Sequence, residues 1–164
     1  ELIEWCNSGY DYIGAPWFRD FRANHLEGDL WATGNGGLSL RRIPSFLSIL
    51  AARQSIGHLR PALKRADRSS LLDMFPTQPP ASQEAIQPLS QQFSGNEDIF
   101  WGLVVPLLEP EFLVAEMKDS LRFSFECDPR YLFKISEGRL PFGCHAWQKH
   151  DPTFWRAHIP PDSL

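Results

Sequence analysis

The sequence has few cysteines, and none of them stands in a recognisable spacing. Cys6, Cys127 and Cys144 are odd in number and far apart, without the Cys-x-x-Cys pairs typical of zinc sites. This pattern excludes a disulfide framework of the kind that stabilises small secreted domains. We therefore expect all three to pack as small apolar residues in a reducing, cytoplasmic compartment.

Long apolar runs and clustered positive charge are also missing. The longest apolar run, 100–108, contains Gly102 and Pro106 and is much shorter than the roughly 18 residues that a membrane-spanning helix needs. The 16 basic residues are outnumbered by 20 acidic ones and are scattered apart from a short cluster at 53–68. We therefore expect no membrane span in this chain and no nucleic acid as its partner.

What is present is enough material for one folded domain. The chain has 164 residues, 43% of them hydrophobic and 13% aromatic, so it can bury a sizeable core within a single domain over 1–164. Short strand patterns alternate with helix patterns, which predicts a layered α/β domain. A Pro-, Ser- and Gln-rich stretch at 67–95 predicts a long excursion loop. The chain starts at Glu1 without a Met and inside an amphipathic pattern, so we expect it to be part of a longer protein.

Hydrophobic periodicity predicts a coarse order of elements. We expect helices at 1–8, 43–51, 97–108 and 117–125, and strands at 10–15, 38–41, 112–115, 131–135 and 140–147. The second helix is the clearest, because its apolar residues recur on one face: Ile43, Phe46, Leu47, Leu50 and Ala51. Pro16 is expected to end the first strand.

The Gly-Asn-Gly-Gly segment at 34–37 is the first candidate site. It lacks the Gly-Lys-Ser of a phosphate-binding loop and the spacing of a dinucleotide fingerprint. Its glycines predict a turn leading into a strand, with a flat backbone against which a sugar or nucleotide can lie. A tight turn that binds nothing is the alternative interpretation.

Two carboxylates at a helix start form the second candidate. Glu97 and Asp98 follow Asn96, where the helix dipole favours negative charge. Such carboxylates suit a general base or a metal contact. Ordinary first-turn capping is the alternative.

Imidazole and acid candidates lie near the C-terminal end. His145 stands in an aromatic segment and is a candidate metal ligand or base, with a core histidine as the alternative. Glu126 could face a pocket or pair with Arg122 four residues earlier. We interpret it as the ion pair with Arg122.

An acid beside an indole is a further candidate, near the start of the chain. Asp11 and Trp17 could together hold a sugar, the ring stacking on apolar C–H faces while the carboxylate accepts hydroxyl hydrogens. A Trp packed in the core is an equal alternative, because aromatic residues also dominate protein interiors.

Four blocks of sequence, taken in order, resemble a known family. They are Asp-Tyr-Ile-Gly-Ala-Pro-Trp at 11–17, Gly-Asn-Gly-Gly-Leu-Ser-Leu-Arg at 34–41, Asn-Glu-Asp-Ile-Phe at 96–100 and Pro-Phe-Gly-Cys-His at 141–145. The order resembles a bacterial and fungal family catalogued as a domain of unknown function and regarded as glycosyltransferase-like. It is also similar to the acceptor-side half of GT-A glycosyltransferases such as the β-1,4-galactosyltransferases.

The resemblance implies an α/β, incomplete GT-A-like fold: a layered mixed sheet flanked by helices, related to Rossmann-like nucleotide-diphospho-sugar transferases. It implies a hexosyltransferase that moves a sugar from a nucleotide-sugar donor to a saccharide or other hydroxyl acceptor, with Mn²⁺ or Mg²⁺. The chain contains no Asp-x-Asp metal motif and no nucleotide-binding half. We expect both to lie upstream of Glu1.

The resemblance also assigns roles to individual residues. Asp98 would be the catalytic base, with Glu97 as the alternative, and His145 would hold the metal. The residues that would line or border the substrate cleft are Asp11, Trp17, Asn35, Gly36, Gly37 and Trp101.

Two other functions remain open from the sequence. One is a catalytically inactive carbohydrate-binding or interaction module on a transferase scaffold, since the nucleotide half is missing and the chain has 6 Trp. The other is a metal-dependent hydrolase that uses Asp98 and His145.

Overall fold

The computed structural model describes residues 1–18, 30–52 and 96–159, and the predicted excursion loop at 67–95 lies outside them. A central antiparallel pair is formed by β1 (Tyr12–Phe18) and β2 (Leu30–Arg41).

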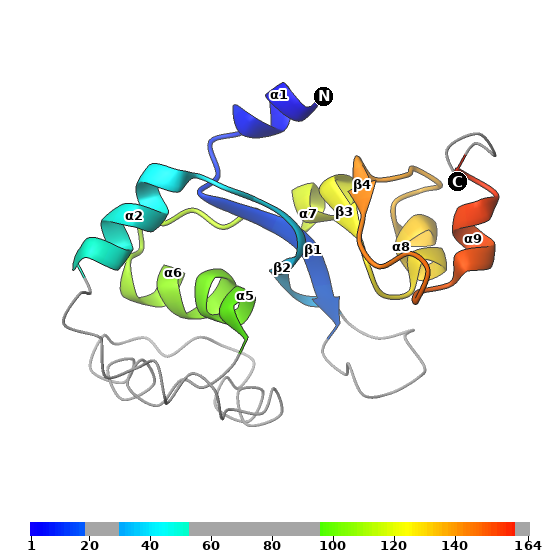
Figure 1. Cartoon of the computed structure of the whole chain (residues 1–164). Coiled ribbons are helices and arrows are strands. Elements are labelled where there is room, and N and C mark those ends of the chain that lie inside the picture. Colours follow the sequence, from blue (N-terminus) through cyan, green and yellow to red (C-terminus); the bar gives the residue numbers. More distant parts are fainter. Residues whose placement is uncertain (19–29, 53–95, 160–164) are drawn as a thin grey trace.

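In Figure 1 this pair separates two groups of elements. The first group holds α2 (Ile43–Ala52), α5 (Glu97–Ile99), η3 (Phe100–Val104) and α6 (Val105–Leu108). The second holds α7 (Met117–Phe123), β3 (Ser124–Phe125), α8 (Pro129–Ile135), β4 (Gly143–Cys144) and α9 (Pro152–Arg156). A short α1 (Leu2–Cys6) precedes β1, and the mixed α/β class is confirmed.

The pairing of β1 with β2 is interrupted by a wide bulge in β2. Gly14 lies opposite Ser39, but its neighbour Ala15 lies opposite Asn35, so the residues at 36–38 have no partner in β1. The predicted strand start at residue 38 was therefore wrong: β2 begins at Leu30, and the glycine segment is a bulge inside a strand. Bulges of this kind leave residues unpaired and bend the bulged strand. Pro16 also lies inside β1 instead of ending it.

Gly14 is the residue that permits this bulge. A Cβ added at Gly14 would collide with the carbonyl oxygen of Asn35, which is backbone and cannot swing away. The Ser120 hydroxyl donates to the Gly14 carbonyl, so α7 is fixed to the same point from the other side. The close approach therefore requires glycine here.

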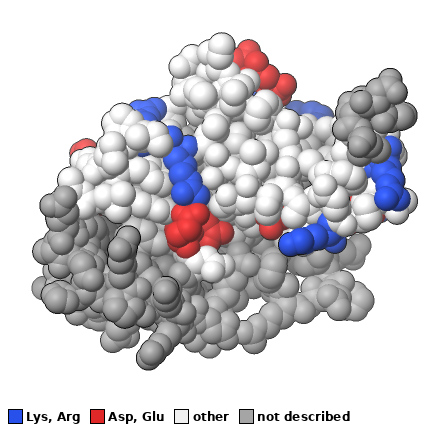
Figure 2. Space-filling model, viewed as in Figure 1, with Lys and Arg blue, Asp and Glu red and all other residues white. Residues whose placement is uncertain are grey.

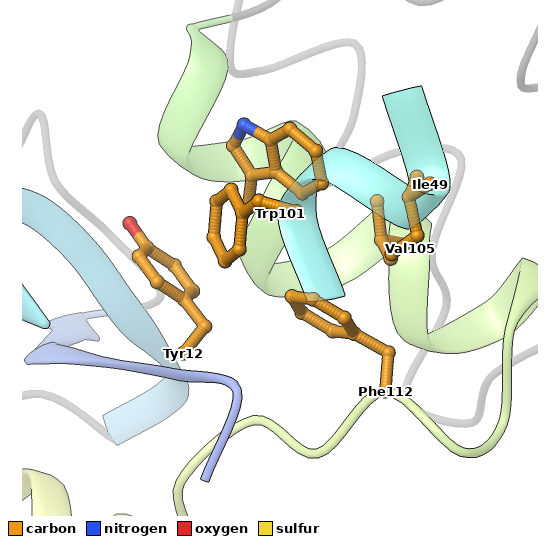
Figure 3. Close-up of a cluster of buried hydrophobic side chains, with 6 residues drawn as sticks. Tyr12, Ile49, Trp101, Val105 and Phe112 are labelled. Atoms are coloured by element: carbon orange, nitrogen blue, oxygen red, sulfur yellow. The ribbon is translucent and has the colours of Figure 1, made fainter. Parts of the chain in front are cut away.

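Aromatic side chains join the first group of helices to the strand pair (Figure 3). Tyr12, Phe46, Trp101 and Phe112 are buried together, and the Phe46 and Trp101 ring centroids lie 4.0 Å apart. Helix α2 packs through Phe46 and Ile49. The predicted apolar face is thus only partly buried, because three of its members are exposed: Ile43, Leu47 and Leu50.

A second aromatic core supports the other group. Phe18 from the end of β1 packs with Phe125, Leu132, Phe154 and Trp155. Strands β3 and β4 pair in parallel over two residues, Ser124 with Gly143 and Phe125 with Cys144. This short pairing places the residue after β4 beside the strand pair.

Several predicted elements differ in the structure. Residues 131–135, expected as a strand, lie in α8, because Asp128 caps a helix that starts at Pro129. The predicted helix at 97–108 is present, but its middle is the π-helix η3; Pro106 has no N–H to bond the carbonyl four residues earlier. The strand expected at 112–115 is a single bridge between Val114 and Tyr12, and that expected at 140–147 is only β4. No helix in the described ranges is long and apolar enough to cross a membrane.

Candidate functional site

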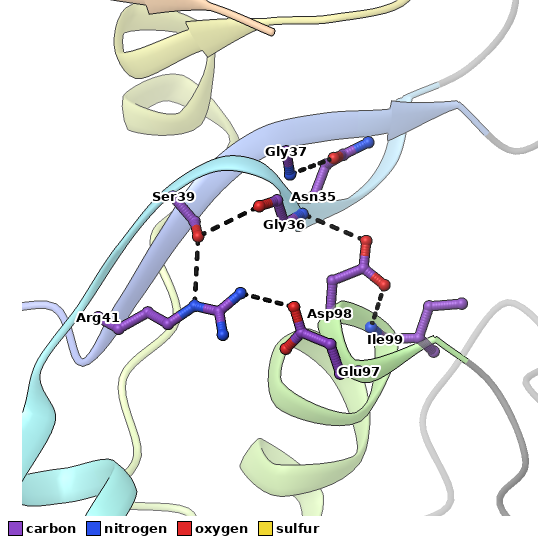
Figure 4. A network of polar contacts seen from close by, with 8 residues as sticks. All are labelled: Asn35, Gly36, Gly37, Ser39, Arg41, Glu97, Asp98 and Ile99. Carbon is purple, nitrogen blue, oxygen red and sulfur yellow. Dashed lines mark hydrogen bonds and ion pairs between the residues drawn. The ribbon is translucent and has the colours of Figure 1, made fainter. Parts of the chain in front are cut away.

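The bulge of β2 carries a network of polar contacts with the start of α5 (Figure 4). The Gly36 N–H donates to Asp98 Oδ2 at 3.2 Å, and the Ile99 N–H donates to Asp98 Oδ1 at 2.8 Å. The Gly37 N–H donates to Asn35 Oδ1 at 3.0 Å. Each oxygen of the Asp98 carboxylate thus accepts one backbone N–H and keeps a second lone pair for another donor. The half-buried carboxylate is held at a fixed orientation against the bulge.

Arg41 ties the same network to the aromatic core. Its Nη2 lies 2.7 Å from Glu97 Oε1, and its Nε donates to Ser39 Oγ at 3.3 Å. The guanidinium stands 5.5 Å from the centroid of the Tyr12 ring, and burial raises the pKa of the Tyr12 hydroxyl. In Figure 2 basic and acidic side chains meet over β2 and the start of α5. Glu97 therefore forms an ion pair with Arg41, whereas Asp98 accepts hydrogen bonds from backbone N–H groups.

His145 lies against the other residue of the bulge. A Cβ added at Gly37 would collide with the imidazole ring of His145, whereas one added at Gly36 would come within 2.9 Å of the Asp98 Cβ. The His145 backbone N–H donates to the Phe125 carbonyl at 3.0 Å, which continues the β3–β4 pairing. Asp98, from the first group of elements, and His145, from the second, thus each lie against one of two neighbouring glycines of the bulge.

The imidazole has its own carboxylate neighbour. Nδ1 of His145 lies 3.2 Å from Oε2 of Glu126. The predicted pair between Glu126 and Arg122 was wrong, because Arg122 instead contacts Asp119 at 3.2 Å. With Nδ1 directed at a carboxylate, the other ring nitrogen of His145 is the one available to a ligand.

Six of the predicted site residues meet at the bulge: Asn35, Gly36, Gly37, Glu97, Asp98 and His145. The other three do not. Trp17 is packed with Ile99 and Val104, and Trp101 is packed against Phe46, so both serve the core in the described structure.

Asp11 likewise holds parts of the fold together. It is buried, accepts from the Ser45 hydroxyl and accepts the Leu113 N–H at 2.8 Å. Arg42 adds an ion pair at 3.6 Å. Asp11 therefore joins β1 to α2 and to the segment that follows α6.

Sequence reasoning missed two contributors to the site, Ser39 and Arg41, and gave a third, Glu126, the wrong partner. Ser39 and Arg41 alternate along β2, and that period of two places both on one face beside the bulge. Glu126 had no such signal, because its approach to His145 depends on the β3–β4 pairing.

The described residues also bear on metal binding. His145 is about half exposed, so its imidazole is accessible to a metal or ligand. Among the described residues, three ligating side chains do gather within 4.8 Å of one another, but they are Glu126, Cys127 and His150. Asp98 and His145 do not belong to that group. A metal at His145 would therefore need further oxygen ligands from a bound substrate or from other residues.

The comparison with known families gives one match that covers most of the chain. A family model described as "Protein of unknown function (DUF5672)" matches residues 1–145. The chain belongs to this family. The DUF5672 match covers the bulge, Glu97, Asp98 and His145, and it ends before His150. Comparisons with curated proteins and with solved structures found no match.

Proposed function

We propose that this chain carries the acceptor-activating part of a metal-dependent glycosyltransferase of GT-A type. The observation that carries the proposal is the bulge of β2, at which Asp98 and His145 contact neighbouring glycines from opposite sides. A sugar transfer needs both a carboxylate at the acceptor and a positive charge at the leaving diphosphate. Asp98 would serve the first task, and a metal ion held at His145 would serve the second.

Asp98 is the proposed general base. Backbone N–H groups fix both of its oxygens, and the remaining lone pairs can accept the proton of an acceptor hydroxyl. The acceptor oxygen then forms a bond to the anomeric carbon of the donor, and the bond from that carbon to the diphosphate oxygen breaks. Glu97 is the weaker candidate because its carboxylate is paired with Arg41.

His145 is the proposed metal-binding residue. Its Nδ1 faces Glu126, an arrangement that commonly orients a ligating imidazole and directs the other nitrogen outward. Mn²⁺ or Mg²⁺ bound there would neutralise the charge on the diphosphate leaving group. The donor set fits such an ion only if the diphosphate itself supplies oxygen ligands, because Asp98 does not lie within the ligand group of the described residues.

The test measures nucleoside-diphosphate release from sugar nucleotides by the full-length protein, with Mn²⁺ and a set of hydroxyl acceptors. Asp98→Asn is expected to reduce turnover by about 10²–10⁴-fold, the usual contribution of a general base. Asp119→Asn is the matched control, because Asp119 is also half-buried and hydrogen-bonded but lies outside the site. An Asp98→Asn variant as active as the wild type would overturn the assignment.

A second candidate is a carbohydrate-binding or interaction module without catalysis. It is favoured because both carboxylates already have structural partners: Glu97 pairs with Arg41, and Asp98 accepts the Gly36 N–H of the bulge. Full-length protein that binds glycans but neither binds nor turns over any sugar nucleotide would support it. Release of sugar to water without an acceptor would instead indicate the hydrolase.

A further inference from the structure

Three potential metal ligands gather beside the proposed site and share only Glu126 with it. One carboxylate oxygen of Glu126, the Cys127 sulfur and one imidazole nitrogen of His150 lie within 4.8 Å of one another. Glu126 and Cys127 lie in the connection from β3 to α8, and His150 lies just before α9. The three come from two segments that are far apart in the sequence, and they are of three different chemical types.

Two matched turns position Cys127 and His150. Each residue precedes an Asp-Pro pair, and the two Asp residues share a left-handed backbone, with φ 41° at Asp128 and 55° at Asp151. Asp128 accepts the Tyr131 N–H at 3.2 Å, and Asp151 accepts the Phe154 N–H at 3.0 Å. Both Asp residues thus cap the helix that follows, and the residue before each cap enters its helix through the same kind of turn.

An ion pair and the aromatic core join the two turns. Arg130, in the first turn of α8, contacts both carboxylate oxygens of Asp151, the cap of α9. Cys127 is 7% exposed and packs in one cluster with Leu132 and Trp155. The positions of the potential ligands are therefore set by helix caps and packing before any ion binds, which lowers the cost of assembling a site.

The Glu126 carboxylate provides a second and independent observation. Its side chain is 13% exposed, and its Oε2 atom is buried and accepts no hydrogen bond within the described part of the chain. A buried carboxylate oxygen without a donor is costly, and a bound cation removes that cost. The neighbour that the structure gives this oxygen is His145 Nδ1 at 3.2 Å, which forms an ion pair with it only when the imidazole is protonated.

From this arrangement we infer a zinc-type metal site formed by Glu126, Cys127 and His150. One thiolate, one imidazole and one carboxylate are the ligands that Zn²⁺ takes, whereas Mg²⁺ and Mn²⁺ prefer oxygen. Ligand atoms around a tetrahedral Zn²⁺ lie roughly 3.3–3.8 Å apart, so atoms that all lie within 4.8 Å of one another need to approach by at most about 1.5 Å. A water molecule would complete the four ligands of the ion.

The ion would fasten α9 to the β3–α8 connection. Asp98 is no part of the site, and His150 lies beyond the residues matched by the DUF5672 model. The inference therefore goes beyond the proposed transferase, which needs an oxygen-preferring ion at His145. The two ideas share Glu126, so variants of Cys127 and His150 test this site and a variant of Asp98 tests the other.

The experiment titrates Co²⁺, a spectroscopic substitute for Zn²⁺, into the chelator-treated full chain. We expect one equivalent to bind with a thiolate-to-cobalt charge-transfer band, to be displaced by Zn²⁺ and to raise the unfolding temperature. His150→Gln should weaken binding at least tenfold, and Cys127→Ser should abolish the charge-transfer band. His150 is half-buried, so its variant tests the site even if the Cys127 variant fails to fold.

Matched controls keep the result specific. Cys144→Ser and His158→Gln should bind Co²⁺ like the wild type, and so should Asp98→Asn, which separates this site from the proposed transferase. Absence of a charge-transfer band in the wild-type chain would overturn the inference. A band that survives in both His150→Gln and Cys127→Ser would overturn it as well.

Discussion

The two sides of the β2 bulge hold their carboxylates in opposite ways. On the α5 side, both oxygens of Asp98 accept backbone N–H groups, and Glu97 is paired with Arg41. On the β4 side, Glu126 Oε2 is buried and accepts no hydrogen bond from the described residues, with His145 as its neighbour. On the α5 side the carboxylate oxygens of Asp98 are hydrogen-bonded by backbone N–H groups. On the β4 side a buried oxygen of Glu126 accepts no hydrogen bond from the described residues.

This difference bears on where chemistry can occur. A carboxylate whose donors are backbone amides keeps its position when a substrate binds, which suits a positioned base. A buried carboxylate that lacks a donor lowers its free energy by gaining a cation or a proton. Under the two proposals, the α5 side would orient the substrate and the β4 side would bind the cation.

The largest loss of stability is expected at Gly14, because both sides of the β2 bulge depend on this residue. Gly14→Ala would drive a Cβ into the Asn35 carbonyl, and we expect the free energy of unfolding to fall by about 3 kcal/mol, since neither backbone segment can move freely. Urea denaturation measures this. At Gly9, with φ 90° and open space around the added Cβ, alanine should cost only about 1 kcal/mol. Equal losses at the two positions would show that the bulge does not need the close approach.

The neighbouring glycines of the bulge should separate the two sides. In Gly36→Ala the added Cβ comes within 2.9 Å of the Asp98 Cβ and 3.2 Å of Glu97 Oε1, so we expect a loss of about 1–2 kcal/mol. In Gly37→Ala the Cβ meets the His145 ring, a half-exposed side chain that can rotate away, so the loss should stay below about 1 kcal/mol.

Urea denaturation of the two variants side by side measures the difference, and NMR of the imidazole protons reports whether His145 has moved. Neither Gly36 nor Gly37 has a positive φ. The two variants therefore differ in the contacts of the added methyl group and not in backbone strain. A greater loss in Gly37→Ala than in Gly36→Ala would mean that the β4 side is the rigid one.

Local pattern was sufficient to predict part of this arrangement. The α/β class, the helix at 43–51 and the acidic start of the helix at 97 follow from periodicity and capping, and the structure contains all three. The bulge was not predictable in this form. Its register depends on the contact between Gly14 and Asn35, which are distant in the sequence and carry no mark of their pairing.

The same limit applies to the individual site residues. Trp17 looked equally suited to a sugar and to a core, and Trp101 was assigned to the cleft by resemblance; tertiary packing places both in the core. Residues 131–135 were predicted as a strand because their apolar character outweighed the Asp-Pro start signal before them. The repeated Asp-Pro pairs after Cys127 and His150 were the local signal that could have revealed both short helices.

The smallest effect is expected at the outer end of the β4 side, where Asp151 caps α9. A hydrogen bond from Arg130 is the main cause that holds the pKa of Asp151 below its ordinary value of 3.8. Because the folded-state pKa is lowered, the stabilisation is fully present above the ordinary pKa and is lost as the pH falls through the folded-state pKa.

Asn still caps a helix but cannot form an ion pair with Arg130. Asp151→Asn should therefore lower the free energy of unfolding by about 0.5 kcal/mol at neutral pH, a small amount because Arg130 is 59% exposed. Urea denaturation at neutral pH and at a pH well below 3.8 measures the difference between the two proteins, which should disappear at the lower pH. A difference that persists there would assign the effect to the cap and not to the ion pair.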